Sequence, residues 1–156
     1  MLASSWMTRR GQERQAQKTL ESRSQVYIGR TFRSARAITG TGDTVSVLPR
    51  AGLRVLYIFN PQCGICRQIK PDVAEFAARL ADRLVSISMD PDSSVFSYWT
   101  ATASPRTLVA IPTVEWRAEL AVSGTPLFLV VDSGGTVRRA QLGFLNRDEM
   151  ARRIGL

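Results

Sequence analysis

The chain has 156 residues, of which 44% are apolar, and its 21 basic and 13 acidic side chains give a net charge of +8. Its length suits one folded domain with a core of its own. Because histidine is absent and only two cysteines are present, the composition excludes Ser-His-Asp and Cys-His catalytic pairs, histidine-ligated zinc or haem, and a four-thiolate metal site within one chain.

The positive charge is concentrated at the N-terminal end. Residues 1–36 carry eight basic and two acidic side chains (8 − 2 = +6), and the other 120 residues carry 13 basic and 11 acidic ones (13 − 11 = +2). We interpret residues 1–25 as a basic polar leader, poorly packed or helical, ahead of a domain over residues 26–156. Most such runs are solvated, and the alternative is contact with nucleic acid or an anionic membrane surface. No apolar run reaches the roughly 18 residues of a membrane span, so we expect a soluble chain.

The first half of the domain begins with short elements. Residues 26–47 hold scattered apolar residues around a Gly-Thr-Gly-Asp stretch at 40–43, which is typical of a hairpin. Residues 53–59 form a continuous apolar run that predicts a buried strand. Residues 65–83 repeat apolar side chains every three to four positions, which predicts a helix.

The second half is predicted to alternate strands and helices. The expected strands cover residues 84–89, 107–114 (interrupted by Pro112), 127–131 and 137–142. The expected helices are a short one over 95–102, one or two turns over 116–122, and a last one that starts at Asn146. Asn146 can cap that helix, and Glu149 three residues later completes a capping-box pattern. The order of elements predicts an α/β fold, with a central mixed sheet and helices on both faces.

The chemistry of the chain is expected where the buried strand meets the first helix. Cys63 and Cys66 lie there, three positions apart. Free backbone N–H groups and the helix dipole stabilise a thiolate at a helix start, so we expect Cys63 to attack a partner disulfide. Cys66, about one turn deeper, would then attack Cys63 and release the partner. The alternative is a structural disulfide or two inert buried thiols.

Several motifs in this order resemble the thioredoxin-like superfamily. They are Cys63-Gly64-Ile65-Cys66 after the apolar strand, Pro71 five residues past Cys66, Gly124-Thr125-Pro126 before the strand at 127–131, and the hairpin turn and glycine-containing exit at 133–145. Within the superfamily, the chain resembles the bacterial TlpA and ResA type over about residues 26–156. The resemblance implies a three-layer thioredoxin-like fold, a cis proline at Pro126, and a protein-disulfide reductase-like enzyme that needs no bound cofactor or metal.

The same resemblance implies where a substrate binds. The Thr125 backbone would pair with an extended substrate segment beside the Cys63 sulfur, as in strand addition. The other substrate-binding residues would be Gln62, Gly64, Ile65 and Pro126. The expected partners are a protein disulfide substrate and a redox partner protein, with no specific nucleic acid.

The chain also departs from the family pattern. Tyr57 stands where thioredoxins have a buried acid, and Ile69 stands where ResA-like proteins have a glutamate, so the usual proton acceptor for Cys66 is missing. Gly64-Ile65 offers no histidine inside the cysteine motif, which favours a reductant or isomerase over a strong oxidant. The missing acid favours a second hypothesis, a redox-idle thioredoxin-like domain kept for docking.

The resemblance bears on location too. TlpA and ResA relatives are usually tethered outside the cytoplasm by an N-terminal helix, which implies a periplasmic or membrane-anchored protein. The arginines near the N-terminus are contrary to the usual bias of positive charge towards the cytoplasm, so a cytoplasmic location is the alternative. A membrane tether or a surface contact through residues 1–36 is the alternative to a solvated leader.

Overall fold

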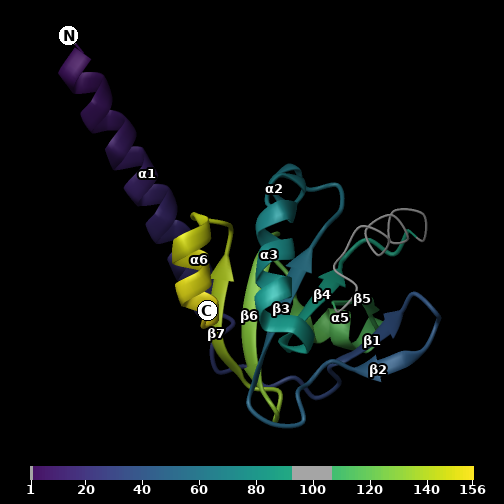
Figure 1. The fold of residues 1–156 in the computed structure, drawn as a ribbon. Coiled ribbons are helices and arrows are strands. Elements are labelled where there is room, and N and C mark those ends of the chain that lie inside the picture. Colours follow the sequence, from purple (N-terminus) through teal and green to yellow (C-terminus); the bar gives the residue numbers. More distant parts are fainter. Residues whose placement is uncertain (1, 93–106) are drawn as a thin grey trace.

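A computed structural model describes residues 2–92 and 107–156, with side chains from residue 8 onward, so the helix expected over 95–102 lies outside the described residues. A seven-stranded sheet with the order β2-β1-β5-β4-β3-β6-β7 forms its centre (Figure 1). The strands are β1 (Arg36–Thr39), β2 (Thr44–Ser46), β3 (Leu53–Phe59), β4 (Leu84–Ser88), β5 (Leu108–Pro112), β6 (Leu127–Asp132) and β7 (Val137–Leu142). The described helices are α1 (Leu2–Gln25), α2 (Gly64–Gln68), α3 (Lys70–Leu80), η1 (Ala81–Arg83), α5 (Val114–Leu120) and α6 (Arg147–Ile154).

The sheet is mixed, as the sequence predicts. β3 pairs in parallel with β4 and antiparallel with β6, so it lies between neighbours of opposite direction. β5 continues the parallel part, and β1, β2 and β7 add antiparallel pairs at the two edges. The hairpin expected around residues 40–43 is the β1–β2 pair.

The central strands are apolar on both faces. On β3, Leu56 and Ile58 pack into one core, whereas Val55, Tyr57 and Phe59 pack into the other. Side chains alternate along a strand, so a strand buried on both faces reads as a continuous apolar run. This is why the sequence alone predicts β3 with its observed bounds.

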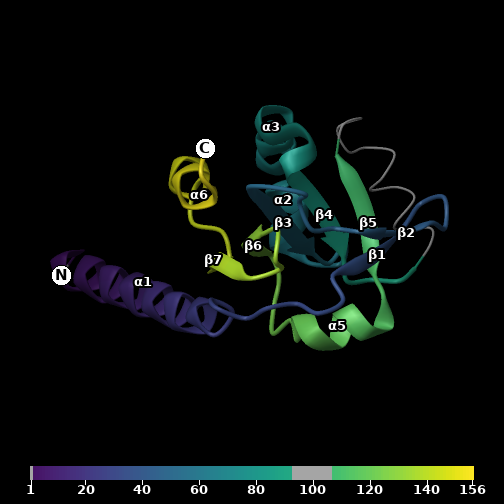
Figure 2. The ribbon, with the colours of Figure 1, turned by 90° about the horizontal axis from the view of Figure 1, so that it is seen from below.

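Helices cover both faces of the sheet and complete three layers (Figure 2). One face carries α2, α3 and α6, and we call it the thiol face; its core includes Tyr57, Phe59, Cys66, Phe76, Phe128 and Met150. The opposite face carries α5 and the end of α1, and we call it the α5 face; its core includes Tyr27, Phe32, Leu56, Trp116, Leu120 and Leu129. The fold is therefore the three-layer α/β architecture expected from the sequence.

The single helix expected over residues 65–83 is instead divided into α2, α3 and η1. Pro71 lies in the first turn of α3, where its missing N–H removes no helical hydrogen bond. α3 ends at Leu80, and the next residue, Ala81, has a positive φ of 52° that interrupts the helix. The apolar repeat continues across both breaks because the pieces cover the same core, so periodicity does not reveal where one helix ends.

The cap of α6 forms, but the predicted capping box is only half present. The Asn146 side chain accepts a hydrogen bond from the Glu149 backbone N–H at 2.9 Å. The Glu149 carboxylate accepts from Arg152 and Arg153 of its own helix. Two guanidinium groups attract a carboxylate more strongly than one neutral N–H does, and this explains why the second half of the box is wrong.

α1 is a helix, which is one of the two forms expected for the leader, and it projects from the rest of the chain for most of its length (Figure 1). Its C-terminal end docks beside β7. The Ser24 hydroxyl accepts from the Leu142 N–H at 2.8 Å, and Arg23 donates to the Ser123 carbonyl at 3.0 Å. Of the helices that the structure describes, none has both the length and the apolar character to cross a membrane.

Candidate active site

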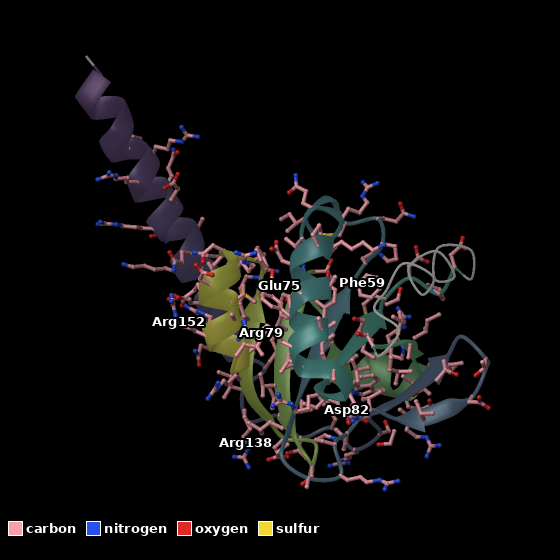
Figure 3. The ribbon with its side chains drawn as sticks, viewed as in Figure 1. Phe59, Glu75, Arg79, Asp82, Arg138 and Arg152 are labelled. Carbon is pink, nitrogen blue, oxygen red and sulfur yellow. The ribbon has the colours of Figure 1, made fainter. Side chains whose placement is uncertain are left out.

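The two cysteines lie just past the C-terminal end of β3. The last residue of this strand is Phe59, which is labelled in Figure 3. Asn60 shapes the turn that follows. Its side-chain oxygen accepts from the Gln62 N–H at 2.9 Å, and its carbonyl accepts from the Cys63 N–H at 2.9 Å. Asparagine is favoured in turns because its side chain can bond to the backbone two residues on. The turn places Cys63 as the N-cap residue of α2.

The Cys63 thiol is half-buried and held by two polar contacts. Its sulfur accepts from the Cys66 N–H at 3.3 Å, and the thiol donates to the Thr125 carbonyl at 3.6 Å. Burial by itself would raise the pKa of the Cys63 thiol. Hydrogen bonds involving Cys66, Thr125 and Ile65 outweigh burial and hold this pKa below its usual value. Cys63 is therefore the thiol that ionises first.

The Cys66 thiol lies behind it and is buried. Burial, followed by the hydrogen bond to the Cys63 side chain, raises the pKa of Cys66 to about 11, and hydrogen bonds with Asn60 and Thr125 offset this only in part. Both cysteines are free thiols in this structure. The site thus holds one acidic accessible thiol and one protonated thiol about a helical turn inward.

The loop before β6 provides the other wall of the site. The Thr125–Pro126 peptide bond is cis, Thr125 is half-buried and Pro126 is buried. The loop lies beside Cys63 because β3 and β6 are antiparallel neighbours in which Ile58 pairs with Leu127. Two segments more than 60 residues apart in sequence are therefore joined by the contact between the Cys63 thiol and the Thr125 carbonyl.

The remaining residues predicted for substrate binding lie on the surface of the turn. Gln62 and Gly64 are exposed, and Ile65 exposes 49% of its area. An exposed isoleucine directly after the cysteine turn gives an apolar contact next to the reactive thiol. The structure thus brings every site residue expected from the sequence to one end of the sheet.

Tyr57 also belongs to this site, although the sequence identifies it only as the residue that stands in place of a buried acid. Tyr57 points into the thiol-face core and exposes 1% of its area. Burial, followed by the proximity of Cys66, raises the pKa of its hydroxyl far above the usual range. The sequence indicates this residue by its position on β3, six residues before Cys63. Side chains alternate between the two faces of a strand, and this alternation directs Tyr57 to the face that α2 covers.

Metal ligands do not gather in the described part of the chain. Over residues 2–92 and 107–156, no group of three or more Cys, Asp or Glu side chains is arranged to hold a metal ion. Cys63 and Cys66 together would supply two of the four ligands that a structural zinc site takes.

No family model and no curated protein matches the chain. Solved structures do match, among them a secreted disulfide oxidoreductase of Mycobacterium tuberculosis homologous to DsbE of Escherichia coli, with a TM-score of 0.63 and 20% identity over 76% of this chain and 92% of that one. A thio-disulfide isomerase of Thermus thermophilus gives a TM-score of 0.63 and 20% identity over 82% of this chain and 96% of that one. The exposed lipoprotein thioredoxin of Streptococcus pneumoniae gives a TM-score of 0.62 and 15% identity over 76% of this chain and 96% of that one. These likenesses show that the chain has a thioredoxin-like fold.

Proposed function

We propose that this protein is a thiol-disulfide oxidoreductase that acts on protein disulfides. The observation that carries the proposal is the contrast within the cysteine pair. Cys63 is accessible and has a lowered pKa, whereas Cys66 is buried and has a raised one. An attacking thiol must be ionised and reachable, and a resolving thiol must stay protonated until the partner is bound. The fold and the position of the pair at the end of β3 support the same assignment.

The reaction follows from this order of ionisation. The Cys63 thiolate attacks one sulfur of the partner disulfide, whose S–S bond breaks, and the other partner sulfur leaves as a thiolate that takes up a proton. Cys66 then loses its proton and attacks the Cys63 sulfur, which forms the Cys63–Cys66 disulfide and releases the second partner thiolate. Two electrons pass from this protein to its substrate. A redox partner protein must return two electrons before the next cycle.

Substrate positioning is assigned to the Thr125–Pro126 loop and the exposed turn. In the resting thiol form the Thr125 carbonyl accepts from Cys63. A thiolate has no proton to donate, so ionisation of Cys63 frees this carbonyl for an N–H of an extended substrate segment. Exposed Ile65, with Gln62 and Gly64, supplies contact surface next to Cys63 in the chain.

The direction of exchange that we propose is reduction or isomerisation. Support comes from Gly64 and Ile65, which place no histidine inside the cysteine motif to stabilise the reduced form strongly. A redox titration against glutathione tests this. A potential well above that of the cellular glutathione pool would reverse the direction to oxidation.

An extracytoplasmic location is also part of the proposal. Its support is that similar structures are described as a secreted oxidoreductase and as an exposed lipoprotein. The basic side chains of α1 that the structure describes are exposed, and their positive charge attracts an anionic surface, such as a membrane, in a salt-sensitive manner. Recovery of the full-length protein only in the cytosolic fraction would contradict this location.

The activity is tested by insulin reduction with dithiothreitol as electron donor. Wild type should accelerate the precipitation of the insulin B chain, and Cys63→Ser should reduce the rate to the uncatalysed background. Val114→Ala is the matched control, since Val114 is 81% exposed on α5 and belongs to the opposite face. Equal rates for wild type and Cys63→Ser would reject the enzyme and favour the docking module.

A further inference from the structure

A buried polar group on the thiol face makes no hydrogen bond within the part of the chain that the structure describes. The Tyr57 hydroxyl makes no hydrogen bond of normal geometry with any described residue, although its oxygen is fully enclosed. An unpaired buried hydroxyl destabilises a protein, and in native proteins such groups are few. Phenylalanine would fill the same space without that cost, so the hydroxyl itself requires an explanation.

The position of this hydroxyl is fixed by aromatic packing. The Tyr57 ring stacks on Phe59 of its own strand at a centroid distance of 5.3 Å and on Phe128 of β6 at 4.9 Å. Tyr57 and Phe128 are also direct register partners in the sheet. A ring held by two stacked neighbours cannot swing its oxygen to solvent, so the oxygen is held where the core places it.

The two sulfurs are the groups that act on this hydroxyl. Cys66 shares the thiol-face core with Tyr57, and its side chain affects the pKa of Tyr57 most after burial, with Cys63 following. Because this pKa is raised far above the usual range, the hydroxyl keeps its proton throughout any reaction near neutral pH. Tyr57 is thus a permanent hydrogen-bond donor close to a sulfur that must become an anion.

We propose that the Tyr57 hydroxyl donates a hydrogen bond to the Cys66 sulfur as it becomes a thiolate, and so promotes the step that resolves the mixed disulfide. This inference rests on the proposed function. Hydrogen bonds used in catalysis are often long or poorly aligned in a resting protein and tighten as charge develops. A hydroxyl that is unpaired beside the thiol and paired beside the thiolate favours the charged form.

The protons and electrons of this step balance without a new reagent. Cys66 gives its proton to solvent, its thiolate attacks the Cys63 sulfur, the bond between Cys63 and the partner breaks, and the leaving partner thiolate takes a proton from solvent. Tyr57 neither gains nor loses a proton. The residue therefore differs in kind from a buried carboxylate at this position, which would accept the proton itself.

A single-turnover reaction isolates this step. Reduced protein is treated with excess 5,5′-dithiobis(2-nitrobenzoate): Cys63 breaks the S–S bond of the reagent, one 2-nitro-5-thiobenzoate leaves at once, and the other stays on Cys63 as a mixed disulfide. Attack by Cys66 then releases this second coloured thiol, and the second phase of the absorbance rise is followed in a stopped-flow instrument. Tyr57→Phe should slow the release about tenfold at neutral pH, because a hydrogen bond to a charged group is lost. The release rate of both proteins should rise with pH, and the profile of the variant should lie at higher pH.

Tyr27→Phe is the matched control. Tyr27 is equally buried, at 1% exposure, but lies on the α5 face, where its hydroxyl bonds with Ala121 and Ser123. Its loss should leave the release rate unchanged. Equal rates and equal pH profiles for wild type and Tyr57→Phe would overturn the inference, and insulin turnover by both proteins would show that the proposed function still holds. A third outcome is that Tyr57→Phe slows the release of the coloured thiol but wild type does not turn over insulin. This outcome would support the inference and reject a protein substrate.

A second variant keeps the test independent of folding. Replacing Tyr57 with 3-fluorotyrosine preserves the shape of the ring and makes the phenol a stronger hydrogen-bond donor. The release of the coloured thiol should then be faster than in wild type. A rate that is unchanged or lower would contradict the role of Tyr57 as a donor.

Discussion

Two buried tyrosines, one on each face of the sheet, are used in opposite ways. The Tyr27 hydroxyl on the α5 face contacts the Ala121 carbonyl and the Ser123 hydroxyl at 3.3 Å each and accepts from the Ser123 N–H at 3.0 Å. The Tyr57 hydroxyl on the thiol face has no such partner among the described residues. The Tyr27 hydroxyl is satisfied and stabilises the fold, whereas the Tyr57 hydroxyl is an unsatisfied donor near a sulfur. The Trp116 indole N–H in the α5-face core is also unpaired among the described residues, so the contrast is between the two tyrosine hydroxyls and their surroundings.

The largest effect that sharpens this contrast is on stability. Leu120→Ala should lower the free energy of unfolding by about 2–5 kcal/mol, because Leu120 is 0% exposed in the α5-face core and its removal leaves a cavity. Chemical denaturation measures this loss, and Val114→Ala on the same helix should cost little. The alkylation rate of Cys63 in the folded variant should equal that of wild type. A large change in that rate would show that the α5 face is not separate from the site.

The next effect concerns the two thiols. Since burial raises the pKa of Cys66 to about 11 and hydrogen bonds hold the pKa of Cys63 below its usual value, Cys63 should react faster at neutral pH by about a hundredfold or more. The rate at Cys63 should rise with pH and reach half of its plateau at a lower pH than in the unfolded protein. Cys66 should still be gaining reactivity at the highest pH at which the protein stays folded.

Pulses of iodoacetamide followed by peptide mass spectrometry measure both rates in one experiment. Protein unfolded in urea is the control, because there both thiols should react alike. Equal rates in the folded protein would remove the distinction between attacking and resolving thiol.

A smaller effect separates the tyrosines themselves. Tyr27→Phe should destabilise the reduced protein by about 0.5–1.5 kcal/mol, because the Ser123 N–H loses its hydrogen bond to the Tyr27 hydroxyl. Tyr57→Phe should leave the stability equal or slightly higher, since it removes an unpaired hydroxyl. Thermal unfolding of both variants under reducing conditions makes the comparison. Equal losses would show that Tyr57 is satisfied in solution.

The smallest effect lies at the surface that joins α3 to α6. Glu75 on α3, which is labelled in Figure 3, accepts from Arg147 of α6 at 2.9 Å. Both side chains are about half exposed. Exposed ion pairs contribute at most about 1 kcal/mol and are screened by salt. Glu75→Gln should therefore lower the free energy of unfolding by less than about 1 kcal/mol, and by less still in high salt. A larger loss that persists in salt would mean that the pair organises the thiol face.

Much of this architecture is visible in the sequence because its signals are local. β3 reads as a continuous apolar run, β7 follows a glycine turn, and the cap of α6 is carried by Asn146. The cysteine pair is also local, since the turn and α2 position both sulfurs within four residues. The break between α2 and α3 is not visible in this way, because both helices bury side chains in one core and their apolar pattern does not change.

The surroundings of the site could not be predicted from local patterns. The contact between Thr125 and Cys63 depends on the pairing of β3 with β6, which the chain order does not fix. The sequence shows that Tyr57 replaces an acid, but the unpaired state of its hydroxyl depends on Phe59, Phe128 and Cys66 together. The family resemblance predicted that Thr125 lies beside Cys63. It did not predict the unpaired hydroxyl of Tyr57.

The most direct test of the account is capture of its covalent intermediate. Reduced Cys66→Ser protein is mixed with a disulfide-bonded peptide, quenched with acid, digested and analysed by mass spectrometry. We expect a stable adduct in which Cys63 is joined to a peptide cysteine, which dithiothreitol removes and which Cys63→Ser protein does not form. Absence of an adduct, under conditions in which Cys63 of the same protein is readily alkylated, would contradict the exchange reaction proposed for this site.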